Sequence, residues 1–252
     1  MAAIICIANQ KGGVGKTTTA VNLAASLAAS EKRVMVVDCD PQGNATTGLG
    51  IDKGTLEHSL YHGLIGEKTA AQLVQQGPLP TLQVLPARVE LIGFEVEMIN
   101  DPERAQTLKK LITPLAADYD FIIIDCPPSL SLLTVNAMTA AHYMIIPLQC
   151  EFFALEGLGQ LLKTYERIKG GLNTDLAIAG IVLTMFDRRT NLSRQVADEA
   201  EKYFKSLVYK TMVPRNVRLS EAPSYGKPIL LYDANSTGAT SYMNLAREIM
   251  HI

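Results

Sequence analysis

The sequence predicts an α/β fold in which a doubly wound, mostly parallel β-sheet is flanked by helices on both faces. Short runs rich in β-branched residues alternate with longer amphipathic segments, as in successive βα units. The runs FIIID and YMIIP are almost entirely apolar, which is typical of strands buried on both faces of a parallel sheet. The length of 252 residues fits one large domain, so we expect a single domain over residues 1–252.

The same patterns give the expected elements. Strands are expected at 3–8, 33–38, 82–85, 121–125, 143–147, 177–184 and 207–213. Helices are expected at 16–29, 102–117, 130–140, 155–169, 191–206 and 236–252. The Gly-rich, polar stretch 46–80 is expected to be an excursion near the functional site. Ligands of doubly wound sheets bind at the carboxyl ends of the strands, so the candidate site residues are sought there.

Charge is unevenly distributed along the chain. The total is 23 − 25 = −2, which implies no polyanionic partner. Residues 160–227, however, hold 12 Lys/Arg and 7 Asp/Glu, a net of +5, and leave −7 for the rest. A basic surface in the C-terminal half and an ordinary solvated face are both compatible with this bias.

The composition also bears on the compartment. The four cysteines lie in or beside apolar runs without a CxxC pair, which predicts reduced, mostly buried thiols in the cytoplasm. The N-terminus lacks the basic region of a signal peptide. No uncharged apolar stretch is long enough to span a membrane, so no stable membrane association is expected.

A phosphate-binding loop is predicted between the first strand and the first helix, where residues 9–18 read NQKGGVGKTT. Glycines let the backbone wrap phosphate oxygens, and the N-terminus of the following helix adds its positive dipole end. In such a loop Lys16 reaches the β- and γ-phosphates, and the Thr17 hydroxyl is a ligand for Mg²⁺. We therefore predict a P-loop NTPase. Its nucleotide-binding residues would include Gly12, Gly13, Val14, Gly15, Lys16, Thr17 and Thr18.

Carboxylates follow two of the apolar strands. Asp125 ends the run FIIID, and at the end of a buried strand beside the phosphate loop it would hold Mg²⁺, directly or through water. Asp38 and Asp40 close the second strand two residues apart, on the same side of the chain if it is extended. An alternative for Asp40 is a purely structural role in the turn before Pro41.

The phosphate loop resembles that of one superfamily of such proteins. Gln10 stands where the common pattern GxxxxGK[ST] has glycine, and Lys11 adds a second lysine. In this respect KGGVGKTT resembles the deviant Walker A box of the ParA/MinD superfamily. The segments PLQCEFFALEG, IVLTMFDRRT and VPRNVRLSEAPSYGKPI resemble successive blocks of chromosomal ParA (Soj) proteins. The resemblance therefore covers nearly the whole chain.

The resemblance implies an ATPase with slow intrinsic turnover that uses ATP and Mg²⁺. In the family, Lys11 would also bind nucleotide, reaching across a homodimer interface to the partner's ATP. The second aspartate of DxDPQGN, Asp40, would position or deprotonate the attacking water, so Lys11, Lys16 and Asp40 would be the catalytic residues. Pro214 and Asn216 would lie against the adenine. The sequence TMFD at 184–187, where guanine-specific enzymes have Asn-Lys-x-Asp, favours ATP over GTP.

The resemblance also implies a DNA-segregation switch. An ATP-bound sandwich dimer would hold nonspecific DNA, with Arg189 and Arg218 contributing from blocks that match DxRT and PRNVR. A ParB-like partner would stimulate hydrolysis and release the DNA. The protein would be cytoplasmic and associated with the nucleoid when ATP-bound. Because the chain begins directly at the first strand, we expect no N-terminal helix-turn-helix extension and no operator recognition.

Two alternatives share the fold. MinD-like ATPases carry a basic amphipathic C-terminal helix, whereas SYMNLAREIMHI has one Arg, one Glu and one His and falls short of a membrane-surface helix. Metallocluster carriers need paired cysteines at a subunit interface, and no cluster motif surrounds Cys39 or Cys126. The sequence leaves open whether the cargo is a chromosome, a plasmid or a protein assembly.

Overall fold

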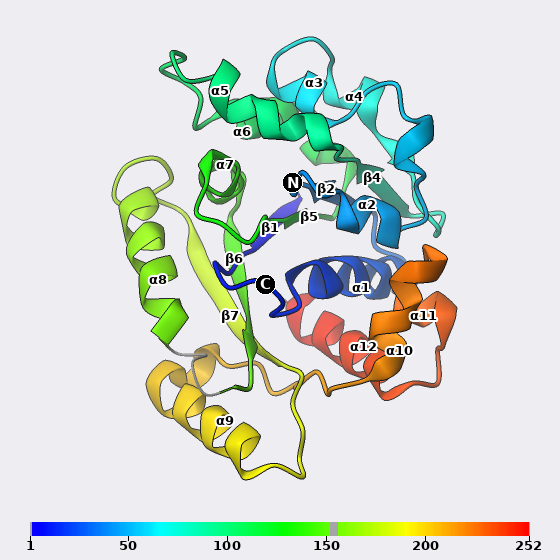
Figure 1. The fold of residues 1–252 in the computed structure, drawn as a ribbon, viewed down its shortest axis with the longest axis vertical. Helices are drawn as coiled ribbons and strands as arrows, with labels where there is room; N and C mark the ends of the chain where they lie inside the picture. The colour runs from blue at the N-terminus through cyan, green and yellow to red at the C-terminus, as the bar shows by residue number, and fades with distance from the viewer. Residues whose placement is uncertain (1, 152–155, 252) are drawn as a thin grey trace.

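A seven-stranded β-sheet forms the centre of the structure, a computed structural model that describes residues 2–151 and 156–251 (Figure 1). The strand order is β3-β4-β2-β5-β1-β6-β7. All neighbours are parallel except β3 and β4, which confirms the predicted mostly parallel sheet. The strands are β1 (Ala3–Ile7), β2 (Val34–Asp38), β3 (Gln75–Gln76), β4 (Leu82–Leu85), β5 (Phe121–Asp125), β6 (Tyr143–Gln149) and β7 (Ala177–Thr184).

Helices connect the strands. The α-helices are α1 (Lys16–Ala29), α2 (Asn44–Gly48), α3 (Leu60–Leu64), α4 (Ala70–Leu73), α5 (Phe94–Glu97), α6 (Thr107–Ile112), α7 (Leu132–Ala140), α8 (Glu156–Lys169), α9 (Asn191–Phe204), α10 (Val217–Glu221), α11 (Ile229–Tyr232) and α12 (Thr237–Ile249). Short 3-10 turns are η1 (Lys53–Thr55), η2 (Val89–Gly93), η3 (Thr113–Asp118), η4 (Lys205–Leu207) and η5 (Ala222–Tyr225).

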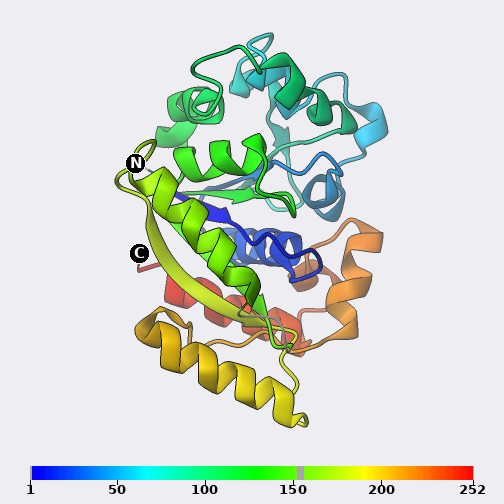
Figure 2. The ribbon, with the colours of Figure 1, turned by 60° about the vertical axis from the view of Figure 1, so that its left-hand side comes forward.

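Both faces of the sheet are covered, as predicted. Successive side chains of a strand point to opposite faces: Cys6 of β1 packs in the core beneath α6, α7 and α8, while Ile5 and Ile7 pack in the core beneath α1 and α12. Figure 2 shows α8, in yellow-green, lying across the side formed by β6 and β7. Every residue of β2 and β5 is buried, which explains their apolar sequences. The central strands therefore form a rigid platform for the loops at their carboxyl ends.

The predicted strand 207–213 is wrong. This segment contacts β7 only at separate points. The N–H groups of Tyr209 and Val213 donate to the carbonyls of Ile181 and Leu183, at 2.9 and 2.8 Å. Isolated bridges pair Ile181 with Val208 and, past the end of β7, Phe186 with Pro214. Between them, the backbone N–H groups of Lys210 and Thr211 donate to the carboxylate of Glu248, at 3.0 and 2.9 Å. A continuous ladder with β7 does not form because a side chain of α12 takes these donors.

Helix boundaries differ from the prediction at several places. The expected helix 102–117 begins only at α6 and then tightens into η3, where Pro114 cannot donate a backbone hydrogen bond. Helix α9 ends at Phe204 because Lys205 takes a φ of 50°. The stretch 46–80 contains three short helices and β3. The expected first residue of the helix at 155 and the last residue at 252 lie outside the described residues.

Candidate nucleotide-binding and hydrolysis site

The predicted phosphate loop leaves the central strand β1 and enters α1. Gly13 and Gly15 have φ values of 75° and 88°, which a residue with a side chain adopts only under strain. Gly15 is the N-cap of α1, so the first backbone N–H groups of the helix point toward the loop. The chain therefore bends sharply here because glycine occupies the two positions that require left-handed backbone.

Lys16 lies inside this loop. Its side chain is buried, and its Nζ donates to the backbone carbonyl of Lys11 at 3.0 Å. Burial lowers the pKa of Lys16, and the nearby carboxylates of Asp125 and Asp40 oppose that shift. The loop thus curls around a desolvated ammonium group, which is the arrangement that a polyphosphate cradle needs.

The sheet brings two of the predicted carboxylates together. Asp38 and Asp125 are register partners at the ends of β2 and β5, and both are fully buried. Burial, and then the charge of Asp38, raises the pKa of Asp125 well above its usual range; Lys16 and the nearby Thr17 hydroxyl lower it. Burial likewise raises the pKa of Asp38 to about 6. These groups would be stabilised as anions by a cation placed among them.

Asp125 fits a role in holding Mg²⁺. Although the Thr17 hydroxyl is close enough to influence it, neither carboxylate oxygen has a partner in hydrogen-bond geometry among the described residues. Those residues also contain no group of three or more His, Cys, Asp or Glu that would hold a metal unaided. Mg²⁺ commonly takes one or two protein ligands and completes its shell with phosphates and water. Thr17 and Asp125 provide such a partial site.

Asp40 is placed by Asp38. Asp38 accepts hydrogen bonds from the backbone N–H of Asp40 at 3.1 Å, and from the backbone N–H and hydroxyl of Thr46 at 2.8 and 2.7 Å. Asp40 itself accepts from the backbone N–H of Gln42 at 2.9 Å. The turn role that the sequence offered as an alternative is therefore real, and it leaves one carboxylate oxygen of Asp40 for other chemistry. No role was predicted for Asp38; its hydrogen bonds to Asp40 and Thr46 show a positioning role.

Two further residues hold the phosphate loop and were not singled out from the sequence. The Thr184 hydroxyl, at the end of β7, donates to the backbone carbonyl of Val14 at 2.9 Å. Asn9 donates to the backbone carbonyl of Pro147 at 2.8 Å and accepts from the backbone N–H of Lys11 at 3.0 Å. The signal for both was their position at the carboxyl end of a strand: Thr184 ends the edge strand β7, and Asn9 follows the central strand β1.

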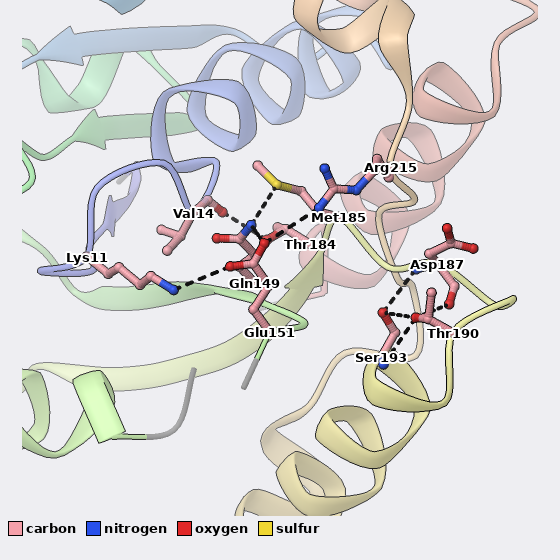
Figure 3. A network of polar contacts seen from close by, with 10 residues as sticks. All are labelled: Lys11, Val14, Gln149, Glu151, Thr184, Met185, Asp187, Thr190, Ser193 and Arg215. Carbon is pink, nitrogen blue, oxygen red and sulfur yellow. Dashed lines mark hydrogen bonds and ion pairs between the residues drawn. The ribbon is translucent and has the colours of Figure 1, made fainter. Parts of the chain in front are cut away.

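The Lys11 side chain points toward Glu151 (Figure 3). Its Nζ lies 3.7 Å from a carboxylate oxygen of Glu151, and its side chain is 37% exposed. Glu151 also lies 3.6 Å from the guanidinium of Arg215 and accepts from Gln149 at 2.6 Å. The second lysine of the loop is thus held at the surface by a shared carboxylate.

The predicted adenine loop is fastened to the end of β7. Phe186 N–H donates to Val213, and Arg215 N–H donates to Phe186, each at 3.1 Å. Pro214 lies between these bonds. Asn216 is the N-cap of α10: it accepts from the backbone N–H of Arg218 at 2.8 Å. Its amide donates to the Thr237 hydroxyl at 2.7 Å. Asn216 therefore has a structural role whether or not it contacts the base.

A basic cavity opens beside this loop. It has a volume of about 1100 Å³. Five cationic side chains and one carboxylate, Asp187, are among its lining residues; the cationic ones are Arg188, Arg189, Arg194, Lys210 and Arg215. Part of the positive charge that the sequence concentrates in residues 160–227 therefore lies around this one cavity.

The two predicted DNA-binding arginines are ion-paired on the surface. The Asp187 carboxylate accepts from both Nε and Nη2 of Arg189, at 2.9 and 2.7 Å. Arg218 contacts Glu221 at 2.9 Å and Asp233 at 3.6 Å. Both guanidinium groups remain more than half exposed.

The cysteines Cys6, Cys39, Cys126 and Cys150 are all buried and free. Burial raises the pKa of the Cys39 thiol well above its usual range. The contact with Cys6 raises the pKa of the Cys126 thiol well above its usual range. Thiols that resist ionisation are poor metal ligands and poor nucleophiles. Their environment matches the prediction of buried, reduced thiols.

Comparison with known proteins places the chain in a family. A family model described as an AAA domain matches residues 2–178. Chromosome partitioning protein ParA of Myxococcus xanthus is 56% identical over 247 residues, which cover 98% of this chain and 87% of that protein. Sporulation initiation inhibitor protein Soj of Bacillus subtilis is 54% identical over 249 residues, covering 99% and 98%.

Solved structures share the fold. Cobyrinic acid a,c-diamide synthase from Mycobacterium smegmatis, with bound ADP and magnesium, has a TM-score of 0.86 at 36% identity and covers 98% of this chain and 93% of its own. The septum site-determining protein MinD of Pyrococcus horikoshii, complexed with Mg-ADP, has a TM-score of 0.81 at 28% identity and covers 99% and 96%.

The fold and the site define a P-loop ATPase whose phosphate loop carries a second lysine. The chain belongs to the ParA/Soj family of chromosome-partitioning ATPases. The family, the ATPase activity and the use of ATP with Mg²⁺ predicted from the sequence are thereby confirmed. The roles of individual residues stay predictions.

Proposed function

We propose that the chain is a switch for DNA partitioning, in which an ATP-bound homodimer holds nonspecific DNA and a ParB-like partner triggers hydrolysis and release. The observation that carries this proposal is the pairing of a complete phosphate site with a second lysine that faces outward. Lys16 lies inside its own loop, whereas Lys11 reaches the surface beside Glu151. A lysine in that position can serve a nucleotide held by another copy of the chain.

Each site residue then has a distinct task. The backbone of Gly12–Thr18 and the ammonium of Lys16 bind the phosphates. Thr17 and Asp125 hold Mg²⁺, which neutralises developing charge on the phosphates when bound. Asp40 orients or deprotonates the attacking water, and Lys11 stabilises the partner's nucleotide across the dimer. Pro214 and Asn216 border the adenine. We place the protein in the cytoplasm, on the nucleoid when ATP is bound, and treat residues 1–252 as one domain.

The basic surface supports the DNA step. Arg189 and Arg218 are exposed, and the cavity beside the adenine loop adds further cationic side chains. Phosphates of DNA would compete with Asp187, Glu221 and Asp233 for these guanidinium groups. A single copy therefore binds weakly, while a rigid dimer doubles the contacts.

A MinD-like role at the membrane has less support. No described helix is long and apolar enough to cross a membrane. The apolar face of α12 is already used: Tyr242, Leu245 and Ile249 are fully buried in the core shared with α1. Little apolar surface of this helix is left to enter a lipid interface.

The test is DNA binding with ATP across a salt series, for the parent, Arg189→Glu and Arg218→Glu. The logarithm of the DNA affinity should fall linearly with the logarithm of the salt concentration, with a slope of about −0.9 per phosphate neutralised. Losing one arginine from each copy of the dimer should reduce the magnitude of this slope by up to about 2. ATP binding should be intact in both variants. Parent-like DNA binding by both variants would place the surface elsewhere, and equal parent binding with ADP would remove the proposed gating by ATP.

A further inference from the structure

An apolar stripe lies exposed on the segment between β4 and α6. Its four members, Val89, Ile92, Val96 and Ile99, are 65%, 63%, 73% and 61% exposed. Val89 and Ile92 on η2 and Val96 on α5 are spaced three and four residues apart, so these three share one face. Ile99 follows in the turn after α5. Exposed apolar side chains scattered singly are ordinary, but a contiguous row of them marks a surface that another molecule covers.

The segment does not need this stripe for its own packing. Leu91 and Phe94, on the opposite face, are fully buried in the core. Those two side chains anchor η2 and α5 to the domain. The outer apolar face is therefore a second one, and among the described residues no packing partner covers it.

The surroundings of the stripe are acidic. Residues 88–103 hold one basic residue, Arg88, and five acidic ones, for a net charge of 1 − 5 = −4. Two of the carboxylates already have a cationic partner: Glu90 pairs with Arg88 at 2.8 Å, and Glu103 pairs with Lys110 at 2.5 Å. Glu95 and Glu97 are exposed and form no ion pair with the described residues. A segment that covered the stripe would gain from basic residues flanking its own apolar face.

One end of the stripe is hydrogen-bonded to the loop of Asp40. The backbone N–H of Ala87, two residues before Val89, donates to the Thr46 hydroxyl at 2.9 Å. The same hydroxyl donates to Asp38 at 2.7 Å, and Asp38 also holds the backbone of Asp40. In addition, a cavity of about 680 Å³ has Val89, Ile92, Pro41 and Gln42 among its lining residues. Movement of the stripe would therefore reach the turn that presents Asp40.

The other end is bonded to the loop that follows Asp125. Glu95 accepts a hydrogen bond at 2.9 Å from the backbone N–H of Leu132, the first residue of α7. Residues 126–131 connect Asp125 to that helix. The stripe is thus tied to both loops whose carboxylates serve hydrolysis in the proposed function.

We propose that this stripe is the docking surface for a basic amphipathic protein segment whose binding stimulates ATP hydrolysis. The proposal rests on the proposed function, because it assigns to one surface the action of the stimulating partner. A segment with an apolar face covers the four side chains, and its cationic flanks face Glu95 and Glu97. Binding changes the hydrolysis rate by favouring one arrangement of the Asp40 turn.

Charge and position favour this occupant over others. A second copy docking on the same stripe would bring together two segments that each carry a net charge of −4. An anionic lipid surface would be repelled in the same way. Figure 1 places α5 at one end of the long axis and α9, which begins two residues after Arg189, at the other. DNA and the partner segment can therefore be held by the chain at the same time.

The test uses the full chain and a synthetic helical peptide of about five turns, with leucines on one face and lysines on the other. A peptide of the same composition in scrambled order is the control ligand. Binding is measured by fluorescence anisotropy with ATP present, and the ATPase rate is measured with and without peptide. The variant is Val96→Ser with Ile99→Ser. The matched control is Val217→Ser on α10, because Val217 is 71% exposed and Val96 is 73% exposed.

We expect the ordered peptide to bind the parent and raise its ATPase rate, and the double variant to bind at least about tenfold more weakly. Basal hydrolysis, ATP affinity and thermal midpoint of the double variant should match the parent, and Val217→Ser should bind the peptide normally. The proposal is overturned if the parent does not bind the peptide, if the scrambled peptide binds equally, or if the double variant binds like the parent. Loss of ATP-dependent dimerisation in the double variant would instead make the stripe a contact between copies. ATP-gated DNA binding is measured separately, so failure of the proposed partitioning function can be distinguished from failure of the docking proposal.

Discussion

At the scale of single residues, Asp40 combines a structural and a chemical task. One of its carboxylate oxygens closes the turn onto the Gln42 N–H, and the charge of the group reaches Lys16 and Asp125. A substitution that removes the whole side chain would disturb both tasks. Asparagine separates them, because its amide oxygen can close the turn while the group can no longer accept a proton.

Asp40→Asn should therefore bind ATP with nearly parental affinity and hydrolyse it at least about 100-fold more slowly, the usual range for losing a general base. ATP-loaded dimers should accumulate. Nucleotide affinity by calorimetry and single-turnover hydrolysis check this.

A matched control for Asp40→Asn is Asp52→Asn. Asp52 accepts from the Gly54 N–H at 2.9 Å in a turn of the same spacing. It should hydrolyse ATP like the parent. If Asp40→Asn also kept the parental rate, Asp40 would be a turn residue only.

At the scale of elements, the phosphate loop has one glycine that the lone chain does not require. Gly13 and Gly15 need their left-handed backbone, but Gly12 does not. A Cβ at Gly12 would meet only the Cβ of Pro128, at 4.0 Å, which is ordinary contact. A reason for glycine at this position must then lie outside the single chain, and the proposed sandwich dimer supplies one.

Gly12→Val should bind ATP but fail to dimerise, because a branched side chain would collide with the loop of the other copy. Sedimentation with ATP measures the dimer, and calorimetry measures nucleotide affinity. Gly171→Val is the control, since a Cβ there also meets only one neighbouring atom, the Arg167 carbonyl oxygen at 3.8 Å. A parental dimer in Gly12→Val would show that the loops do not approach one another.

At the scale of the whole molecule, the buried carboxyl groups link stability to pH. The pKa of Asp38 is raised by burial to about 6, above its value of 3.8 in an unfolded chain. The folded state then holds this proton to higher pH than the unfolded state, so the free energy of unfolding falls as pH rises from about 4 to about 6. The total change for Asp38 is roughly 2–3 kcal/mol, and Asp125 acts in the same direction.

Mg²⁺ and ATP should offset this loss, because a cation beside Asp125 favours the ionised carboxylates. We expect the rise in thermal midpoint caused by Mg²⁺-ATP to be larger at about pH 7.5 than at about pH 5.5. Thermal unfolding with and without Mg²⁺-ATP at both values measures it. Asp125→Asn should lose most of the difference, which separates the protein's carboxylates from titration of ATP itself. If Mg²⁺-ATP raised the thermal midpoint of the parent equally at both pH values, Asp125 would not be a group that holds Mg²⁺.

The sequence by itself determined six of the seven strands and the phosphate loop; the short edge strand β3 was not predicted. Strands such as FIIID are buried on both faces, so their apolar runs give their positions directly. The glycines and Lys16 lie within one short stretch, where local geometry follows from residue type. The family resemblance followed from the same local blocks and is confirmed by comparison.

Only the tertiary structure decided the features that depend on residues far apart in the chain. The segment 207–213 reads as a strand, but Glu248 of α12 takes two of its donors. Asp38 gains its task from Thr46, and Lys11 gains its surface position from Glu151. The stripe from Val89 to Ile99 is left exposed, because Leu91 and Phe94 fill the core there. Local propensity cannot anticipate these outcomes, because each depends on which side chain another element brings to the same place.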